Sequence, residues 1–373
     1  MPADLAPVSA APGALPSSPL RAALRRIAAP VLWPTATSMR RLALAGVVAN
    51  AAIMSTGAAV RLSKSGLGCP DWPACTRSSI VASHTAGQTT LNTWIEFGNR
   101  LLNFPLVAVA AIVFIAAWRY RPPGAAGRRK DLLWLSAALP AGVVAQAVLG
   151  GIVVLTKLNP AWVSIHFVTS TAIVGAAVML HTRCGEGAGP ATPLVRREIR
   201  VLGGALVAVV GVMVAAGTVV TGTGPLAGSA DAPRYHLPLI GVTQFHADIG
   251  WLLAGVTTGL MAGLVFSGAP RRAVARGWIF VGLLLVQGVI GYAQYFSGLP
   301  AGLVWVHVTT AVLVWIAALR LFFALRDRGP AETGPAVTAE TGAAGAPATG
   351  AVGQAVPGRT TAAGTSPAPG PGA

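Results

Sequence analysis

The sequence predicts an all-α integral membrane protein with eight transmembrane helices, arranged as two duplicated four-helix halves. Three observations lead to this fold class. Hydrophobic residues make up 54% of the chain and charged residues only 10%, whereas about a quarter of a soluble domain is charged. Eight apolar stretches approach the roughly 20 residues that a spanning helix needs. A motif of Gln, Gly and His also occurs twice. Because lipid cannot satisfy backbone groups, apolar segments of this length predict a helical bundle.

The predicted spans are apolar runs separated by polar or basic segments: 42–60, 96–118, 133–156, 162–182, 201–221, 245–267, 278–296 and 303–324. They divide into a first half, 39–183, and a second half, 184–325. Residues 1–38 are basic and rich in Ala and Pro, and residues 326–373 are mostly Ala, Gly, Pro and Thr. Such compositions cannot bury a core, so we expect both ends to be disordered.

Lysine and arginine residues are concentrated on one side of the predicted bundle. Most of the 27 flank the N-terminus, every second connection and the C-terminus. The positive-inside rule then places both termini in the cytoplasm of a bacterial cell and makes 61–95 and 222–244 outer loops. A net charge of +16 would suit nucleic-acid binding if it lay on one face. Its distribution between apolar runs fits membrane topology instead, and we expect no nucleic-acid partner.

The repeated motif places a Gly four residues after a Gln and a His twenty residues after it. Its two copies are Gln146, Gly150 and His166, and Gln287, Gly291 and His307. Repeats of this kind predict an internal duplication. Because both halves begin on the same side, we expect a pseudo-twofold axis along the membrane normal.

Three histidines are expected near the outer ends of their helices: His166, His246 and His307. Neutral imidazole is a common ligand of haem iron, and two histidines on facing helices can hold the iron from both sides. A glycine one turn from each Gln lets a flat macrocycle or another helix approach. The alternative is that these glycines only pack helices, which the polar side chains join. We favour haem because the pattern is duplicated and His246 accompanies it.

A complete repeat would place a fourth histidine opposite His166, but the best-placed residue is Asn99. An amide is a poor ligand of iron. The first half is therefore predicted to hold a site with one protein ligand and an open position, which suits substrate or oxygen chemistry. The second half, with His246 and His307, is predicted to be closed by two ligands.

Glu96 and Arg100 lie four residues apart and share a helix face at the membrane edge. One interpretation is an interfacial ion pair that fixes the helix end. The other makes Glu96 a proton donor or acceptor beside the open site, because ionisable residues at this depth are usually functional. Arg100 could instead pair with a haem propionate.

Cys69 and Cys75 lie in the first outer loop. Outside a bacterial membrane, two such close cysteines can form a disulfide. We favour a structural staple over a redox-active dithiol. The spacing does not indicate a zinc site, because further ligands are missing.

Three sets of residues together resemble one family, the haem A synthases: residues 57–75, residues 95–100 and the two Gln, Gly, His hairpins. The resemblance covers about residues 40–325. It implies eight helices in two halves and oxidation of the C8 methyl group of haem O to the formyl group of haem A, which serves the terminal oxidase. It also implies haem B as the cofactor, and successive hydroxylation through an alcohol and a gem-diol.

The resemblance also assigns roles to residues. His246 and His307 would bind the iron of haem B, and His166 would belong to the site for the substrate haem. Glu96 would be the family's acidic residue, and Cys69 and Cys75 its outer-loop cysteine pair. Asn99 departs from the pattern, because many members have histidine there. Implied partners are membrane lipid, a haem O synthase as supplier, and assembly factors of the terminal oxidase.

Two other functions compete with this one. A di-haem electron carrier of the cytochrome b kind would prefer four histidines, and this chain offers three that are well placed. A non-catalytic transporter or assembly factor predicts a polar pathway at mid-membrane, whereas the predicted helix centres are nearly free of charge.

Overall fold

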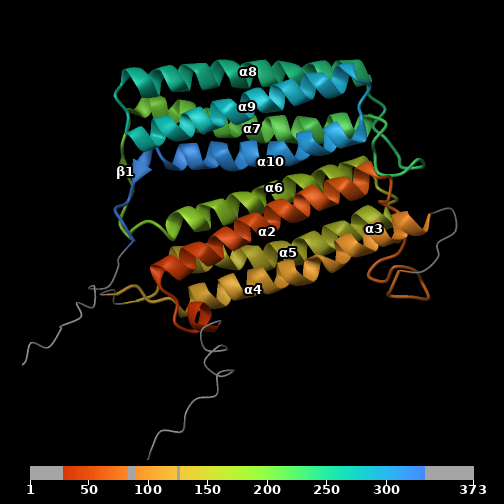
Figure 1. Cartoon of the computed structure of the whole chain (residues 1–373), viewed down its shortest axis with the longest axis horizontal. Helices are drawn as coiled ribbons and strands as arrows, with labels where there is room; N and C mark the ends of the chain where they lie inside the picture. Colours follow the sequence, from red (N-terminus) through yellow and green to blue (C-terminus); the bar gives the residue numbers. More distant parts are fainter. Residues whose placement is uncertain (1–27, 83–88, 124–126, 332–373) are drawn as a thin grey trace, which may run out of the picture. The chain divides into compact units, whose positions relative to one another are not determined.

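The computed structural model describes residues 28–82, 89–123 and 127–331. Within these ranges it contains eight helical segments that are long and apolar enough to cross a membrane, one for each predicted span (Figure 1). Helices and strands follow in chain order: α2 (Ala36–Leu62), α3 (Thr90–Leu101), α4 (Asn103–Arg119), α5 (Lys130–Leu155), α6 (Pro160–Arg183), β1 (Thr192–Pro193), α7 (Arg197–Thr223), α8 (Leu239–Phe266), α9 (Arg271–Phe296), α10 (Ala301–Phe323) and β2 (Arg326–Asp327).

Both expected disordered ends contain some regular structure near the bundle. Helix α2 begins at Ala36 because a capping box precedes it: Thr35 Oγ1 accepts from the Ser38 amide, and Ser38 Oγ accepts from the Thr35 amide. After α10, Arg326 and Asp327 form strand β2, which pairs antiparallel with β1. The described parts of the two predicted ends, 28–38 and 326–331, thus contain helix at 28–32 and 36–38 and strand at 326–327. Residues 1–27 and 332–373, on which the rest of that prediction falls, lie outside the described residues.

The second span consists of two helices, α3 and α4, which meet at Leu102. Pro105 explains the break. A proline has no amide hydrogen to donate four residues back, and its ring clashes with the carbonyl at that position, which belongs to Leu101. Helix α3 therefore ends at Leu101 and carries its polar residues, including Glu96 and Arg100, as a separate short helix beside the outer loop.

Each half packs its helices in the same order. In the first half, α2 contacts α4, α4 contacts α5, α5 contacts α6 and α6 contacts α2. In the second half, α7 contacts α8, α8 contacts α9, α9 contacts α10 and α10 contacts α7. Between the halves, α6 packs on α7 and α10 on α2, which are equivalent contacts when the halves are exchanged. This symmetry supports the duplication.

The hairpin loops of the two halves share one backbone conformation. Two consecutive residues with positive φ end each loop: Lys157 and Leu158 (55° and 64°), and Gly298 and Leu299 (79° and 60°). The amide of Leu158 donates to the Val153 carbonyl at 2.8 Å, and that of Leu299 donates to Gln294 at 2.8 Å. These positions are related by the same shift in sequence as the repeated Gln, Gly and His residues.

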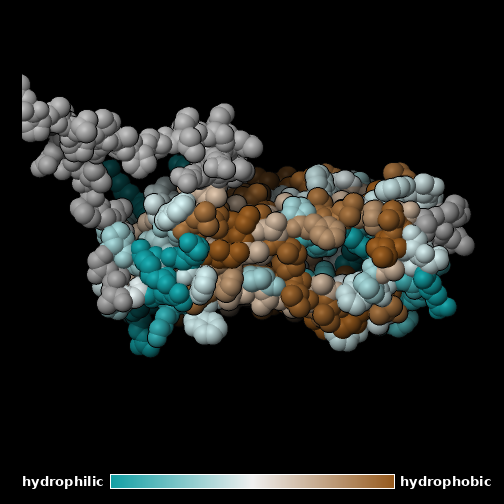
Figure 2. All heavy atoms as spheres, turned by 90° about the horizontal axis from the view of Figure 1, so that it is seen from below, coloured by the Kyte–Doolittle hydropathy of each residue, from teal (hydrophilic) through white to brown (hydrophobic). Residues whose placement is uncertain are grey.

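The apolar surface suits lipid. The face in Figure 2 is largely hydrophobic in the middle, and hydrophilic residues gather toward the ends. Large apolar side chains such as Phe245, Trp251 and Val289 are 62–69% exposed on the spanning helices. Burial of such area in lipid rather than water is favourable, so the described bundle is that of a multi-pass membrane protein.

Candidate functional site

The repeated glutamines join the two helices of each hairpin. Gln146 Nε2 donates to the backbone carbonyl of His166 at 3.1 Å, and Gln287 Nε2 donates to that of His307 at 3.0 Å. In an α-helix the carbonyl oxygen of each histidine already accepts a hydrogen bond from a backbone amide of the next turn. The glutamine side chain donates to the second lone pair of that oxygen. In each hairpin the glutamine of the first helix therefore fixes the position of the histidine along the second helix.

A glycine faces each histidine ring. A Cβ atom added to Gly150 would lie 3.5 Å from Cε1 of His166, and one added to Gly291 would lie 3.2 Å from Cε1 of His307. The third histidine has the same environment, because a Cβ on Gly217 would lie 3.2 Å from Cε1 of His246. Each imidazole thus packs on bare helix backbone; a Cβ would be crowded at Gly291 and Gly217, and at Gly150 it would make an ordinary contact.

His246 and His307 face each other in the second half. Their ring centres are 6.5 Å apart, and their planes make an angle of 64°. A metal ion bound by one nitrogen of each ring at roughly 2 Å would hold the ring centres roughly 6 Å apart. This spacing fits an iron between two axial imidazoles.

The ring nitrogens also fit a site that binds a further group. The Nδ1 atoms of His166, His246 and His307 are buried, and none has a hydrogen-bond partner among the described residues. A buried polar group without a partner is costly, so its presence in a native fold calls for a ligand or a functional role. Imidazole nitrogens are ligands of haem iron, so His246, His307 and His166 are the residues that could hold a haem; Nε2 of His307 also lies 3.2 Å from Gln287 Nε2.

The first half differs where Asn99 replaces a histidine. Gly57 on α2 corresponds to Gly217 on α7, but no side chain occupies the space beside it: a Cβ on Gly57 would meet nothing within 4 Å. The Oδ1 atom of Asn99 is buried and has no partner among the described residues. An imidazole would fill this position in the second half. The first half thus has unfilled space beside Gly57 and an unpartnered Asn99 Oδ1, where the second half has Gly217 packed against His246.

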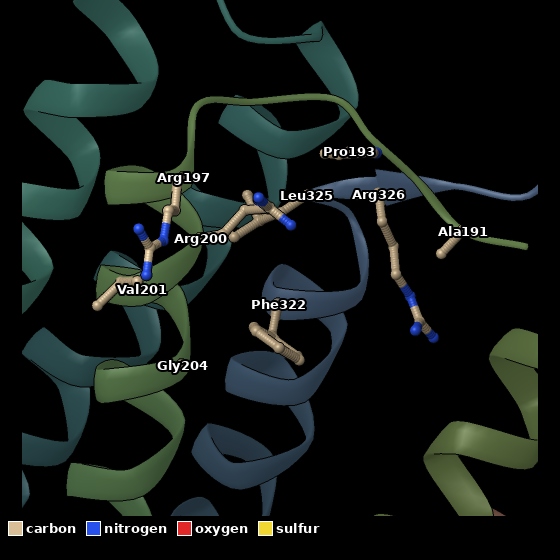
Figure 3. A pocket seen from close by; sticks show the side chains of 9 residues that line it. All are labelled: Ala191, Pro193, Arg197, Arg200, Val201, Gly204, Phe322, Leu325 and Arg326. Carbon is tan, nitrogen blue, oxygen red and sulfur yellow. The ribbon is translucent and has the colours of Figure 1, made fainter.

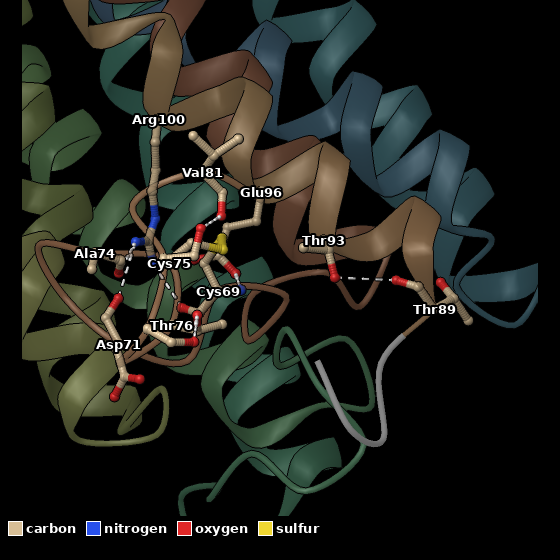
Figure 4. The surroundings of a disulfide bond; sticks show 12 residues. Cys69, Asp71, Ala74, Cys75, Thr76, Val81, Thr89, Thr93, Glu96 and Arg100 are labelled. Carbon is tan, nitrogen blue, oxygen red and sulfur yellow. Dashed lines mark hydrogen bonds and ion pairs between the residues drawn. A yellow bond between two sulfur atoms is a disulfide. The ribbon is translucent and has the colours of Figure 1, made fainter. Parts of the chain in front are cut away.

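Glu96 and Arg100 form the expected ion pair, at 2.7 Å between Oε1 and Nη2 (Figure 4). The other carboxylate oxygen of Glu96 accepts from the backbone amide of Cys69 at 2.8 Å. Only 5% of Glu96 is exposed, so these charge-assisted bonds take the place of water. The ion pair of the first interpretation is thus present, and through Cys69 it also contacts the outer loop.

The Arg100 guanidinium donates hydrogen bonds to three backbone carbonyls of the outer loop. It donates to the backbone carbonyls of Cys69 at 2.7 Å, Asp71 at 3.0 Å and Ala74 at 3.1 Å (Figure 4). When the bond to Glu96 Oε1 is included, each of the two terminal nitrogens donates two hydrogen bonds. The alternative that Arg100 pairs with a haem propionate is therefore not supported, because its donors already bind the loop.

The outer loop is closed by a disulfide between Cys69 and Cys75. It carries Trp72, whose indole ring packs on Gly151 of α5; a Cβ there would lie 2.7 Å from Cδ2 of Trp72. The neighbouring residue Gly150 contacts His166. The disulfide loop thus covers the outer end of the first-half site.

Trp72 was not singled out from the sequence. The available signal was the pair Gly150 and Gly151, since the second half has Gly291 followed by Tyr292. A second glycine at only one copy of the repeat indicates that a bulky group approaches the helix there. In the structure this group is Trp72.

Comparisons with known proteins identify the family of this chain. The sequence profile of the family described as Cytochrome oxidase assembly protein matches residues 40–319, which is about three quarters of the chain. A protein named Heme A synthase from Methylobacterium sp. is 32% identical over 175 residues, 44% of this chain and 42% of that protein. Another with this name, from Geobacillus thermodenitrificans, is 30% identical over 110 residues, 29% of this chain and 30% of that protein. The aligned part is thus less than half the length of these relatives.

Proposed function

The chain belongs to the Cytochrome oxidase assembly protein family, and we propose that it is a haem A synthase. It would oxidise the C8 methyl group of haem O to a formyl group and so produce haem A for a terminal oxidase. The change is a four-electron oxidation of the methyl carbon by two successive hydroxylations, R–CH3 + 2 O → R–CH(OH)2 → R–CHO + H2O, and an external oxidant supplies both oxygen equivalents. The observation that carries the proposal is the facing pair His246 and His307, 6.5 Å apart, next to a second histidine site that is open.

We assign the second half to the cofactor, haem B. His246 from α8 and His307 from α10 would bind its iron on both faces, and Gly217 and Gly291 leave the rings their space. Haem B held by these two histidines would supply electron-transfer chemistry. Gln287 would hold the helix that carries His307 through its bond to the His307 carbonyl.

We assign the first half to the substrate, haem O. His166 would bind its iron from one side, and the space beside Gly57 and Asn99 leaves the other side open. An open position suits oxidation chemistry at the substrate. Glu96 and Arg100 hold the disulfide loop, and Trp72 of this loop packs on Gly151. The loop would thereby shield the site at its outer end.

Glu96 has two proposed roles that an experiment can separate. Its carboxylate anchors the disulfide loop through Cys69 and Arg100, and we propose that it also moves a proton at the first-half site. The proposed membrane orientation puts this site and the loop on the outer side of a bacterial plasma membrane, with both termini in the cytoplasm. A haem O synthase in the same membrane would then supply the substrate.

The cofactor assignment is tested with His307→Ala. We expect the purified variant to lose the optical spectrum of b-type haem, because one of two axial ligands is gone. His181→Ala is the matched control, since His181 is a buried histidine of α6 outside the site, and we expect it to keep the spectrum. An unchanged spectrum in His307→Ala would mean that the second-half site is misplaced.

The role of Glu96 is tested with Glu96→Gln, which keeps the shape of the side chain and an oxygen that can accept. We expect haem B to remain bound while conversion of haem O stops. Arg100→Gln is the control, because it disturbs the same loop but leaves the carboxyl group. Full turnover in Glu96→Gln would remove Glu96 from the mechanism. Equal losses in both variants would restrict it to anchoring the loop.

A further inference from the structure

A pocket of about 490 Å³ lies at the other end of the bundle from the disulfide loop, between the start of α7 and the end of α10 (Figure 3). Its walls combine two kinds of residue. Three arginines line its mouth, namely Arg197 and Arg200 from the first turn of α7 and Arg326 from β2. Apolar groups line the rest, among them Val201, Gly204 and Phe322.

The positive charge at the mouth is not neutralised by the protein. Neither Arg197 nor Arg200 forms an ion pair or a side-chain hydrogen bond with any residue that the structure describes. The Nε atom of Arg326 is buried and likewise has no partner there. Its guanidinium carbon lies 5.0 Å from the ring centre of Phe323, a cation–π contact that offsets only part of the positive charge.

The acidic residues nearest in sequence are engaged elsewhere. Glu198 lies 3.8 Å from Arg196, and the carboxylate of Asp327 accepts from the backbone amides of Arg328 and Gly329 at 2.9 and 3.2 Å. Burial lowers the pKa of Arg326, and the carboxylate of Glu186, which is hydrogen-bonded to Arg183, raises it by less. An anion is therefore the missing component of this pocket.

The apolar wall decides what kind of anion fits. Val201, Gly204 and Phe322 belong to the segments of α7 and α10 that span the membrane, and Val201 is 61% exposed on the surface that faces lipid. Arg197, Arg200 and Arg326 lie at the ends of the same segments, where a bilayer around these spans would place its headgroups. A free phosphate ion would leave the apolar part empty, whereas a phospholipid would place its phosphate and an acyl chain against the matching walls.

We propose that this pocket binds an anionic glycerophospholipid. The phosphate would receive charge-assisted hydrogen bonds from Arg197, Arg200 and Arg326, because guanidinium groups match phosphate oxygens in geometry. An acyl chain would lie along Val201, Gly204 and Phe322. Basic pockets between transmembrane helices are known to bind anionic headgroups in this way. The lipid would join α7 to the segment after α10 in the second half.

The test is a lipid titration followed by native mass spectrometry of the detergent-purified full chain. Dioleoyl phosphatidylglycerol is the probe, and dioleoyl phosphatidylcholine is the neutral comparison. For Arg200→Gln we expect about a tenfold loss of affinity for phosphatidylglycerol, which is the usual effect of removing one charged hydrogen bond. Arg196→Gln is the matched control, because it removes the same charge from a neighbouring residue that does not line the pocket.

Two further variants keep the test decisive. Arg326→Gln removes a guanidinium from the opposite wall and should weaken binding to a similar extent, even if Arg200→Gln folds poorly. Gly204→Leu fills the apolar part while all three arginines remain; a Cβ there already lies 3.9 Å from Phe322. We expect it to exclude the lipid.

Three results would overturn the proposal. Equal affinity for phosphatidylglycerol in Arg200→Gln and Arg196→Gln would show that the pocket is not the lipid site. Equal affinity for the two lipids in the unaltered chain would show that charge does not select the ligand. If inorganic phosphate displaces phosphatidylglycerol at equal concentration and Gly204→Leu has no effect, the site takes a free anion. None of these variants lies near His246 or His307, so the outcome is separate from that of the proposed enzyme activity.

Discussion

The duplicated glycines give a prediction in which one substitution should have opposite effects in the two halves. Gly57 in α2 and Gly217 in α7 occupy corresponding positions. A Cβ on Gly217 would lie 3.2 Å from His246 Cε1, whereas a Cβ on Gly57 would meet nothing within 4 Å. We therefore compare Gly217→Ala with Gly57→Ala, each of which adds one methyl group to a helix.

The magnitudes follow from these contacts. Carbon atoms pack at about 3.5–4.0 Å, so the His246 ring must retreat by roughly 0.3 Å or more in Gly217→Ala. A binding group must be held within about 0.5 Å of its productive geometry, and this shift uses most of that tolerance. In Gly57→Ala the methyl group enters the open space proposed for the substrate haem and leaves His246 and His307 untouched, and the better helix propensity of Ala is worth about 1 kcal/mol. This corresponds to a rise in melting temperature on the order of 2 °C.

The assay measures the haem content per protein, the optical spectrum of the reduced form and the thermal midpoint of both purified variants. We expect Gly57→Ala to keep the haem and its spectrum with a slightly higher midpoint. For Gly217→Ala we expect less bound haem B, or a spectrum with a weakened axial ligand. If Gly217→Ala retains the unaltered spectrum and haem content, the His246 ring is not held at Gly217 as an iron ligand.

Three other predictions follow from the same structure. Arg100→Met removes the four hydrogen bonds between the guanidinium and its partners. We expect the free energy of unfolding to fall by about 2–3 kcal/mol and proteolysis in the outer loop to become faster. An unchanged cleavage pattern would contradict this. Burial raises the pKa of the Cys184 thiol to about 12, so the thiol should stay protonated at pH 8, below that pKa. A maleimide should then label no cysteine in the native protein, one after unfolding and three after unfolding with reduction of Cys69 and Cys75; native labelling would refute the burial. Asn99→His should fill the open position of the first-half site, giving a second six-coordinate low-spin haem signal and slower turnover, and an unchanged spectrum would show that residue 99 does not face the iron.

Much of the fold could be predicted because lipid imposes simple rules on sequence. A span must be apolar over its whole length, and all eight predicted spans have a helical counterpart in the structure. The repeat of Gln146 and His166 in Gln287 and His307 predicted equivalent hairpins, and the hydrogen bonds to the histidine carbonyls are equivalent in both.

Other features depend on contacts that a linear pattern does not contain. The break between α3 and α4 could have been read from Pro105, because its effect is local. The position of Trp72 over Gly151 and the four hydrogen bonds of Arg100 could not, since both join the outer loop to helices far along the chain. The strand pair β1 and β2 is too short to leave a periodic signal.

The site was predicted in type rather than in detail. The sequence indicated that His246 and His307 belong together, and the structure adds the 6.5 Å between their rings. The sequence also pointed to Asn99 as the residue that departs from the repeat. The empty space at Gly57 became apparent only from the packing of α2, because the absence of a contact has no residue pattern of its own.

The most direct test of the proposed function is extraction and chromatography of the haems from the full chain purified in detergent. The proposed haem A synthase predicts haem B together with haem O or haem A, which would mean that the first-half site accepts substrate although Asn99 is not a ligand. A folded preparation that contains haem B alone and fails to convert added haem O would favour a membrane electron carrier. A folded preparation without any haem would contradict the account.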